Sequence, residues 1–175
     1  AGEYQGVRVM ASGLLGKIRL HLQIDVGFGD AVVPGPIEIK FPQLLDLGQP
    51  VLLGYTPESS IAEKFHAMVV LDMVNTRMKD FYDIWMLLTT LDLDTAVLGE
   101  AIRRTFAQRK TQLPDEIPGA LTDTFTDDPT KKLQWQAFLR KNRLDTSLEL
   151  GAVTKIIRAN LMPLLGERID EKDEV

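Results

Sequence analysis

The stretch "NTRMKDFYDIW", residues 75–85, brings charged and aromatic side chains together in one short segment. A helix advances about 100° per residue, so the two kinds of side chain separate onto different arcs. The apolar arc holds Phe81, Ile84, Trp85 and Leu88, and the charged arc holds Lys79, Asp80 and Asp83. The spacing predicts an amphipathic helix from about Thr76 to Thr90, with Arg77 at its start on the apolar side. By itself this pattern also fits a surface helix with one ordinary Lys79–Asp83 pair.

The segment before it, "YTPESSIAEKFHAMVVLDM", predicts another helix. Thr56 is a good N-cap, Pro57 suits the first helical position, and Glu58 suits the positive end of the helix dipole. A buried stripe follows at helical spacing: Ile61, Phe65, Met68 and Val69. Lys64 flanks that stripe. Its ammonium could extend into solvent above a packed stem, or it could bind a phosphate as a point charge.

Strands come before the helices. Residues 4–11 and 15–26 predict two strands of an antiparallel hairpin, with "SGLLG" as the turn and strict apolar–polar alternation over 18–26 typical of a half-buried strand. "IEIKF" predicts a short extended piece. Further helices are expected over about 94–110, 129–143 and 148–165, with a loop over 113–130. This order indicates an α+β fold, with a β-rich part at 1–55 and a helical domain at 56–175.

Composition excludes several classes of protein. The 175 residues include no cysteine, which excludes disulfides and cysteine-based zinc sites and fits a cytoplasmic location. No apolar run approaches the roughly 20 residues of a membrane span. The net charge of −5 argues against nonspecific nucleic-acid binding by bulk charge. Basic residues nevertheless gather over 103–110 and 131–143, where they could hold an RNA backbone or form a solvated face.

Asp25 ends the second predicted strand on its polar face, where a carboxylate can bind Mg²⁺ or stay an ordinary exposed residue. "LDLD" at 91–94 has the spacing of a metal pair, but Asp94 stands where the next helix needs an N-cap. His21 and His66 have no second His or Cys nearby in the sequence, so we expect no zinc site.

In combination, "LQIDVGFGD", a Pro-rich stretch, "YTPESSIAEKFHAM" and "NTRMKDFYDIWML" resemble the AbiEii/AbiGii toxin family of nucleotidyltransferases, over about residues 4–90. The resemblance implies a polymerase-β-like nucleotidyltransferase core followed by a helical domain. It implies transfer of a nucleotide from an NTP to an acceptor, tRNA in some members, by a toxin paired with an antitoxin, with Mg²⁺ as cofactor.

The resemblance also assigns residues. Asp25 would be the strand carboxylate that binds metal, and Lys64 would bind the NTP phosphates. Asp80 would position Lys64 or act near the acceptor hydroxyl, with Arg77, Lys79 and Asp83 around it as substrate-binding residues. One departure is large, because the family's Gly-Ser and Asp-x-Asp motif is absent. We expect that motif to precede residue 1, so that this chain is the C-terminal part of the enzyme and is inactive alone.

Two other hypotheses remain open. The chain could be a non-catalytic module that binds an antitoxin or an RNA, or a helical scaffold with ordinary surface charges. A homodimer through an exposed edge strand near residues 4–11 is a further expectation.

Overall fold

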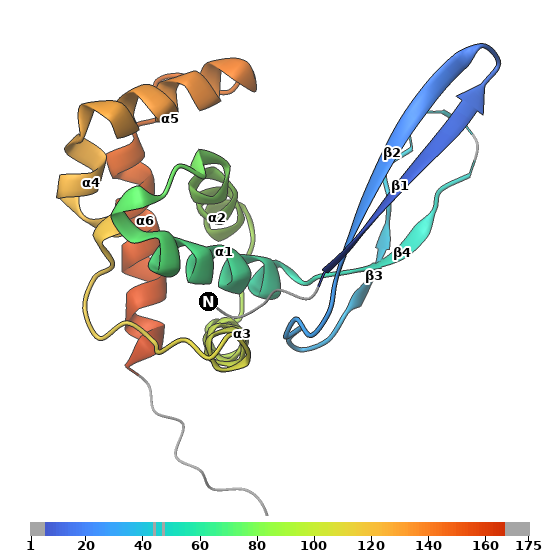
Figure 1. The fold of residues 1–175 in the computed structure, drawn as a ribbon. Coiled ribbons are helices and arrows are strands. Elements are labelled where there is room, and N and C mark those ends of the chain that lie inside the picture. The colour runs from blue at the N-terminus through green and yellow to red at the C-terminus, as the bar shows by residue number, and fades with distance from the viewer. Residues whose placement is uncertain (1–5, 44, 47, 167–175) are drawn as a thin grey trace, which may run out of the picture. The chain divides into compact units, whose positions relative to one another are not determined.

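A computed structural model of the protein describes residues 6–43, 45–46 and 48–166 (Figure 1). The chain forms two compact units, residues 1–31 and residues 32–175. Two small antiparallel sheets and a set of helices make up these units, which confirms the α+β class. The predicted domain division after residue 55 follows composition rather than contacts and stays a prediction.

The first unit is a hairpin of β1 (Gly6–Leu15) and β2 (Ile18–Gly27). Gly16 and Lys17 form its turn, and Gly16 has a φ of 60°, which suits glycine at the first central position of a two-residue turn. The prediction of a turn over all of "SGLLG" is therefore wrong, because pairing continues to Leu15 and Ile18. Residues 4 and 5 of the predicted strand lie outside the described residues.

At several positions the hairpin register places apolar residues opposite apolar residues and polar residues opposite polar ones. Val7 pairs with Val26 and Val9 with Ile24, whereas Arg8 pairs with Asp25 on the other face. Every residue of β2 is exposed, so the predicted alternation is present but the prediction of a half-buried strand is wrong.

In the second unit, β3 (Ile37–Lys40) pairs antiparallel with β4 (Val51–Gly54), which confirms the extended piece predicted at "IEIKF". The helical elements that follow are α1 (Pro57–Leu71), η1 (Asp72–Val74), α2 (Met78–Thr90), α3 (Thr95–Gln108), η2 (Gly119–Leu121), α4 (Asp123–Asp127), α5 (Pro129–Lys141), α6 (Leu150–Leu161) and η3 (Met162–Leu165). The five predicted helices correspond to α1, α2, α3, α5 and α6.

The loop predicted over 113–130 is partly wrong, because it contains η2 and α4. Thr122 caps α4 by accepting a hydrogen bond from the backbone N–H of Phe125, and Leu121 and Phe125 are buried. Burial of these two side chains therefore stabilises a short helix that the Pro- and Asp-rich sequence does not indicate.

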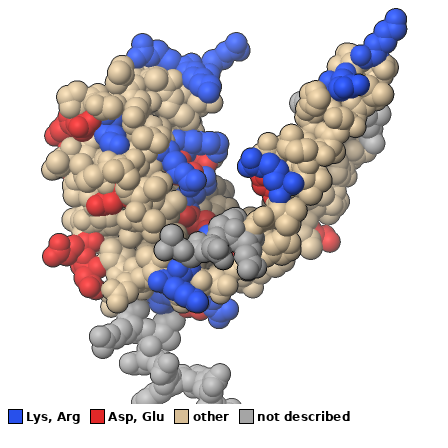
Figure 2. All heavy atoms as spheres, viewed as in Figure 1, with Lys and Arg blue, Asp and Glu red and all other residues tan. Residues whose placement is uncertain are grey.

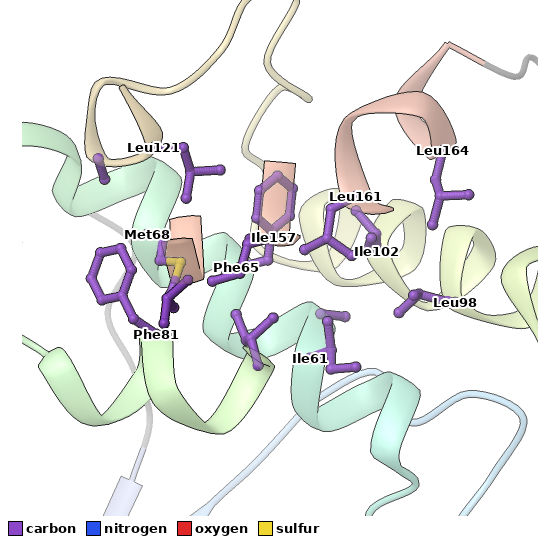
Figure 3. Close-up of a cluster of buried hydrophobic side chains, with 14 of the residues drawn as sticks. Ile61, Phe65, Met68, Phe81, Leu98, Ile102, Leu121, Ile157, Leu161 and Leu164 are labelled. Atoms are coloured by element: carbon purple, nitrogen blue, oxygen red, sulfur yellow. The ribbon is translucent and has the colours of Figure 1, made fainter. Parts of the chain in front are cut away.

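The core of the second unit lies among its helices. α1 packs against α3, and α2 packs against α6. Figure 3 shows the side chains that meet there, including Phe65 and Met68 of α1, Phe81 of α2 and Ile157 of α6. The apolar arc of 75–85 thus anchors α2 in the core through Phe81 and Ile84, both fully buried. Among the described residues, no helix has both the length and the apolar character needed to cross a membrane.

Candidate functional site

The start of α1 is fixed by hydrogen bonds. Thr56 accepts a bond from the N–H of Ser59 at 3.2 Å and donates one to the carbonyl of Val33 at 2.7 Å. The N–H of Val33 in turn donates to the Ser59 hydroxyl at 2.8 Å. Two turns further along α1, this firmly held helix carries Lys64.

The start of α2 is held by a buried asparagine. Asn75 is fully buried, and its side-chain oxygen accepts a hydrogen bond of 2.8 Å from the backbone N–H of Arg77. The helix then begins at Met78, so that Asp80 and Asp83 lie in its first two turns. The predicted charged arc is therefore carried on a helix whose start is fixed by packing.

Lys64 lies between two carboxylates of α2. Its Nζ is 2.8 Å from Oδ1 of Asp80 and 2.8 Å from Oδ2 of Asp83. Lys79 forms a second ion pair with Asp83, and Nη1 of Arg77 lies 3.8 Å from Oδ2 of Asp80. We call these five residues, Lys64, Arg77, Lys79, Asp80 and Asp83, the Lys64 cluster. Figure 2 shows blue and red side chains side by side over α2.

The cluster has an inner and an outer part. The side chains of Lys64, Asp80 and Asp83 are 24%, 15% and 16% exposed, whereas those of Arg77 and Lys79 are mostly exposed. Three cations face two carboxylates, so the cluster has a net charge of +1 at neutral pH. The sequence placed Arg77 on the apolar side of the helix, and this was wrong. Arg77 precedes the first helical residue and its guanidinium turns toward Asp80.

Burial and pairing act in opposite directions on the pKa values of the inner residues. Burial by itself lowers the pKa of Lys64, but its hydrogen bonds to Asp80 and Asp83 outweigh this and the pKa is raised. Burial by itself raises the pKa of Asp83, but hydrogen bonds from Lys64 and Lys79 outweigh it and the pKa is lowered. The ammonium and the carboxylate therefore both stay charged across the neutral range.

Asp25 is engaged within the hairpin. Its two carboxylate oxygens accept hydrogen bonds from Nε and Nη2 of Arg8, at 2.6 and 3.3 Å, and Gln23 donates a further bond at 2.9 Å. The hydrogen bond from Arg8, followed by that from Gln23, lowers the pKa of Asp25. The resemblance assigns Asp25, Lys64 and Asp80 to one enzyme, and their convergence into one site stays a prediction.

Comparison with known families identifies the family of the chain. Residues 1–165 match the family described as "Nucleotidyl transferase AbiEii toxin, Type IV TA system". The chain belongs to the AbiEii toxin family. The resemblance argued from motifs is thus confirmed, and the match extends beyond residue 90 to include the later helices. Comparison with curated proteins and with solved structures gave no match.

Membership of the AbiEii nucleotidyltransferase family implies a divalent metal ion, and the side chains of the described residues are poorly arranged to bind one. No group of three or more His, Asp or Glu side chains within them could hold a metal ion. Asp25 offers one carboxylate, whose oxygens are already bonded to Arg8. The metal role of Asp25 stays a prediction, and a metal ion there would compete with Arg8 for that carboxylate.

The other residues singled out in the sequence lie outside the Lys64 cluster. Asp94 caps α3 by accepting hydrogen bonds from the N–H groups of Ala96 and Val97, as predicted. His66 is half-buried and lies 2.9 Å from the hydroxyl of Thr111. Burial first, and then nearby Arg109, lower the pKa of His66. His21 lies on the hairpin, 3.4 Å from Ser12.

Lys131 supports the Lys64 cluster, and sequence reasoning missed it. This α5 lysine is 9% exposed, donates a 2.7 Å hydrogen bond to the backbone carbonyl of Asn75, and lies over the ring of Phe125. Through Asn75 it helps to fix the start of α2. In the sequence Lys131 stands beside Lys132 in a basic stretch, and no local signal separates the buried lysine from the exposed one.

Proposed function

We propose that this chain is the part of a nucleotidyltransferase toxin that binds the NTP phosphates, and that the Lys64 cluster is the binding site. The observation that carries the proposal is the position of Lys64 between Asp80 and Asp83 in a chain of the AbiEii family. An ammonium has three N–H donors. Two of them face carboxylates, and the third remains for a phosphate oxygen.

In this proposal Asp80 positions Lys64 or acts near the acceptor hydroxyl, and Arg77 and Lys79 add positive charge at the exposed side. The acceptor hydroxyl oxygen forms a bond to the α-phosphorus as its proton passes to Asp80 or to water. The bond from that phosphorus to the β-phosphate oxygen breaks, and pyrophosphate leaves. Lys64 would balance the negative charge that accumulates on the leaving group, as fixed cations do in phosphoryl transfer.

The partners follow from the same proposal. The substrate would be an NTP, the acceptor would be a tRNA, and a cognate antitoxin would neutralise the toxin in the cytoplasm. β1 pairs only with β2 among the described residues, so its other edge is open to a second copy of the chain. That open edge supports the expected homodimer.

A transfer assay tests this function. The full-length gene product would be incubated with each labelled NTP, total tRNA and Mg²⁺. We expect label on the RNA, and a decrease on the order of 100-fold for Lys64→Ala and for Asp80→Ala. Asp127→Ala is the control, because it removes a carboxylate whose lysine partner, Lys132, is exposed. Equal transfer by all variants would contradict a role for the Lys64 cluster.

The second candidate is a non-catalytic module that binds an antitoxin or an RNA. The bonds between Arg8 and both oxygens of Asp25 favour it, because they occupy the one carboxylate assigned to the metal. Absence of label on any acceptor, together with tight binding of an antitoxin or RNA, would support this second function.

A further inference from the structure

A groove lies next to the Lys64 cluster, between the start of α2 and the end of α5. It has a volume of about 680 Å³. The side of the groove formed by α2 includes Arg77, Lys79 and Asp80, which also belong to the Lys64 cluster. The side formed by α5 includes Phe138 and Lys141. The groove is therefore continuous with the site proposed to bind an NTP.

The charge of this groove is mainly positive. Among the described residues that line it, the only carboxylate is that of Asp80, whose oxygens already lie near Lys64 and Arg77. α5 contains no Asp or Glu, and Lys141 forms no ion pair with any described residue. Figure 2 shows blue side chains gathered over the end of α5, with no red among them.

The other basic residues singled out in the sequence are mostly paired elsewhere. Arg103 and Arg104 both lie beside Glu100, and Arg109 lies 2.8 Å from Glu63. On α5, Lys131 is buried and Lys132 pairs with Asp127. Ion pairing thus divides the basic residues that the sequence presents as one set. The positive charge at the end of α5 is not balanced by an ion pair with any described residue.

The uncharged residues that line the groove indicate which class of ligand it binds. Two amides, Gln134 and Asn142, and the partly buried ring of Phe138 also line the groove. A positively charged groove that follows the phosphate backbone, together with aromatic side chains on which bases stack, is typical of single-stranded nucleic-acid sites. An acidic protein would be attracted by the cations, but it would make less use of the aromatic and amide groups.

We propose that this groove binds a single-stranded segment of the acceptor RNA, with Lys141 and Arg77 on its phosphates, and directs the RNA toward the Lys64 cluster. The proposal rests on the proposed function, because it assigns the acceptor's path to the same site. It requires no movement of the buried core, since Arg77 and Lys141 are both exposed.

The test measures RNA affinity of the full-length protein as a function of salt, with fluorescently labelled total tRNA as the probe. We expect Lys141→Ala to weaken binding and to reduce the slope of log affinity against log salt by about 0.7, the value for one phosphate contact on a single strand. In the double variant Lys141→Ala/Arg77→Ala, the slope should fall by about twice as much. Lys132→Ala is the matched control on α5 and should leave both quantities unchanged.

Parallel measurements separate this proposal from the proposed function. NTP binding and nucleotide transfer would be measured on the same variants. Transfer to RNA with an unchanged RNA affinity in Lys141→Ala would overturn the groove and leave the transferase intact. Loss of RNA affinity in that variant, in a protein that transfers no nucleotide, would support the groove and contradict the transferase.

Two other results would also overturn the proposal. One is a full-length protein that does not bind tRNA at all. The other is a purified cognate antitoxin whose affinity falls in Lys141→Ala while RNA affinity does not, which would assign the groove to a protein partner.

Discussion

Asp83 forms ion pairs with two lysines, and its replacement should destabilise the helices. It is 16% exposed and pairs with both Lys64 and Lys79. Exposed pairs contribute about 0–1 kcal/mol and breaking buried ones costs about 3–5 kcal/mol. We expect Asp83→Asn to lower the free energy of unfolding by about 1–2 kcal/mol at pH 7, measured by urea denaturation. Asp127→Asn, which removes an exposed pair with Lys132, should have a smaller effect.

The pKa shifts of Asp83 and Lys64 set the pH range over which Asp83→Asn lowers the free energy of unfolding. The pKa of Asp83 is lowered from 3.8, so its contribution is present above pH 3.8 and is lost as the pH falls through the lower, folded value. The pKa of Lys64 is raised from 10.5, so its contribution is present below that pH and is lost above it. The stability difference between wild type and Asp83→Asn should therefore be constant near neutrality and shrink in acid. A difference that persists unchanged at pH 2 would contradict this assignment.

Lys131 gives a second prediction at the scale of a single residue. Lys131→Met keeps the length and packing of the side chain but leaves the carbonyl of Asn75 without its 2.7 Å donor. A buried acceptor left unsatisfied costs about 1–3 kcal/mol, and we expect a loss of that size in thermal or urea unfolding. Lys132→Met, on the exposed side of α5, is the control. Equal stabilities of the two variants would show that Lys131 is replaceable.

The Lys64 cluster shows what sequence can and cannot predict about a site. The arc of Lys79, Asp80 and Asp83 was predicted because it depends only on the period of one helix. The contact between Lys64 and Asp80 was expected only from the family resemblance, and the second contact, with Asp83, was not predicted, because both depend on how α1 and α2 pack together. Arg77 was misplaced because the helix begins one residue after it.

At the scale of elements, the start of α1 depends on Thr56, which caps the helix and also bonds to Val33. Thr56→Val removes both bonds while keeping the side-chain shape, and we expect a loss of about 1–2 kcal/mol in the free energy of unfolding. Thr56→Ser retains the hydroxyl and should lose less. The cap has no role in stability if the serine and valine variants unfold at the same urea concentration.

Helix starts were easier to predict than turns and short helices. Thr56 and Asp94 were recognised because a capping residue stands directly before a periodic apolar pattern. The hairpin turn was misplaced because Gly13 and Gly16 both suit a turn and only strand pairing selects Gly16. α4 was missed because its five residues stay helical through the burial of Phe125, which the local sequence does not show.

At the scale of the whole molecule, net charge was a poor guide to local charge. The chain carries −5 overall, yet α5 has four basic residues and no acidic one. On α3, Arg103 and Arg104 both pair with Glu100, and at the start of α5 Lys132 pairs with Asp127. A local basic surface can therefore exist on an acidic protein, and only the three-dimensional pairing shows where it lies.

The buried core, like the basic surface, is confined to one part of the chain. Every buried hydrophobic residue among those described lies between Val33 and Leu164, in the second unit, whereas the hairpin β1–β2 is exposed along both strands. Because stability depends mainly on buried apolar surface, the second unit has what it needs to fold alone. A chain of residues 32–166 should unfold cooperatively in urea, with a free energy within about 1 kcal/mol of that of residues 1–175. A truncated chain without a cooperative transition would show instead that the helices depend on the hairpin.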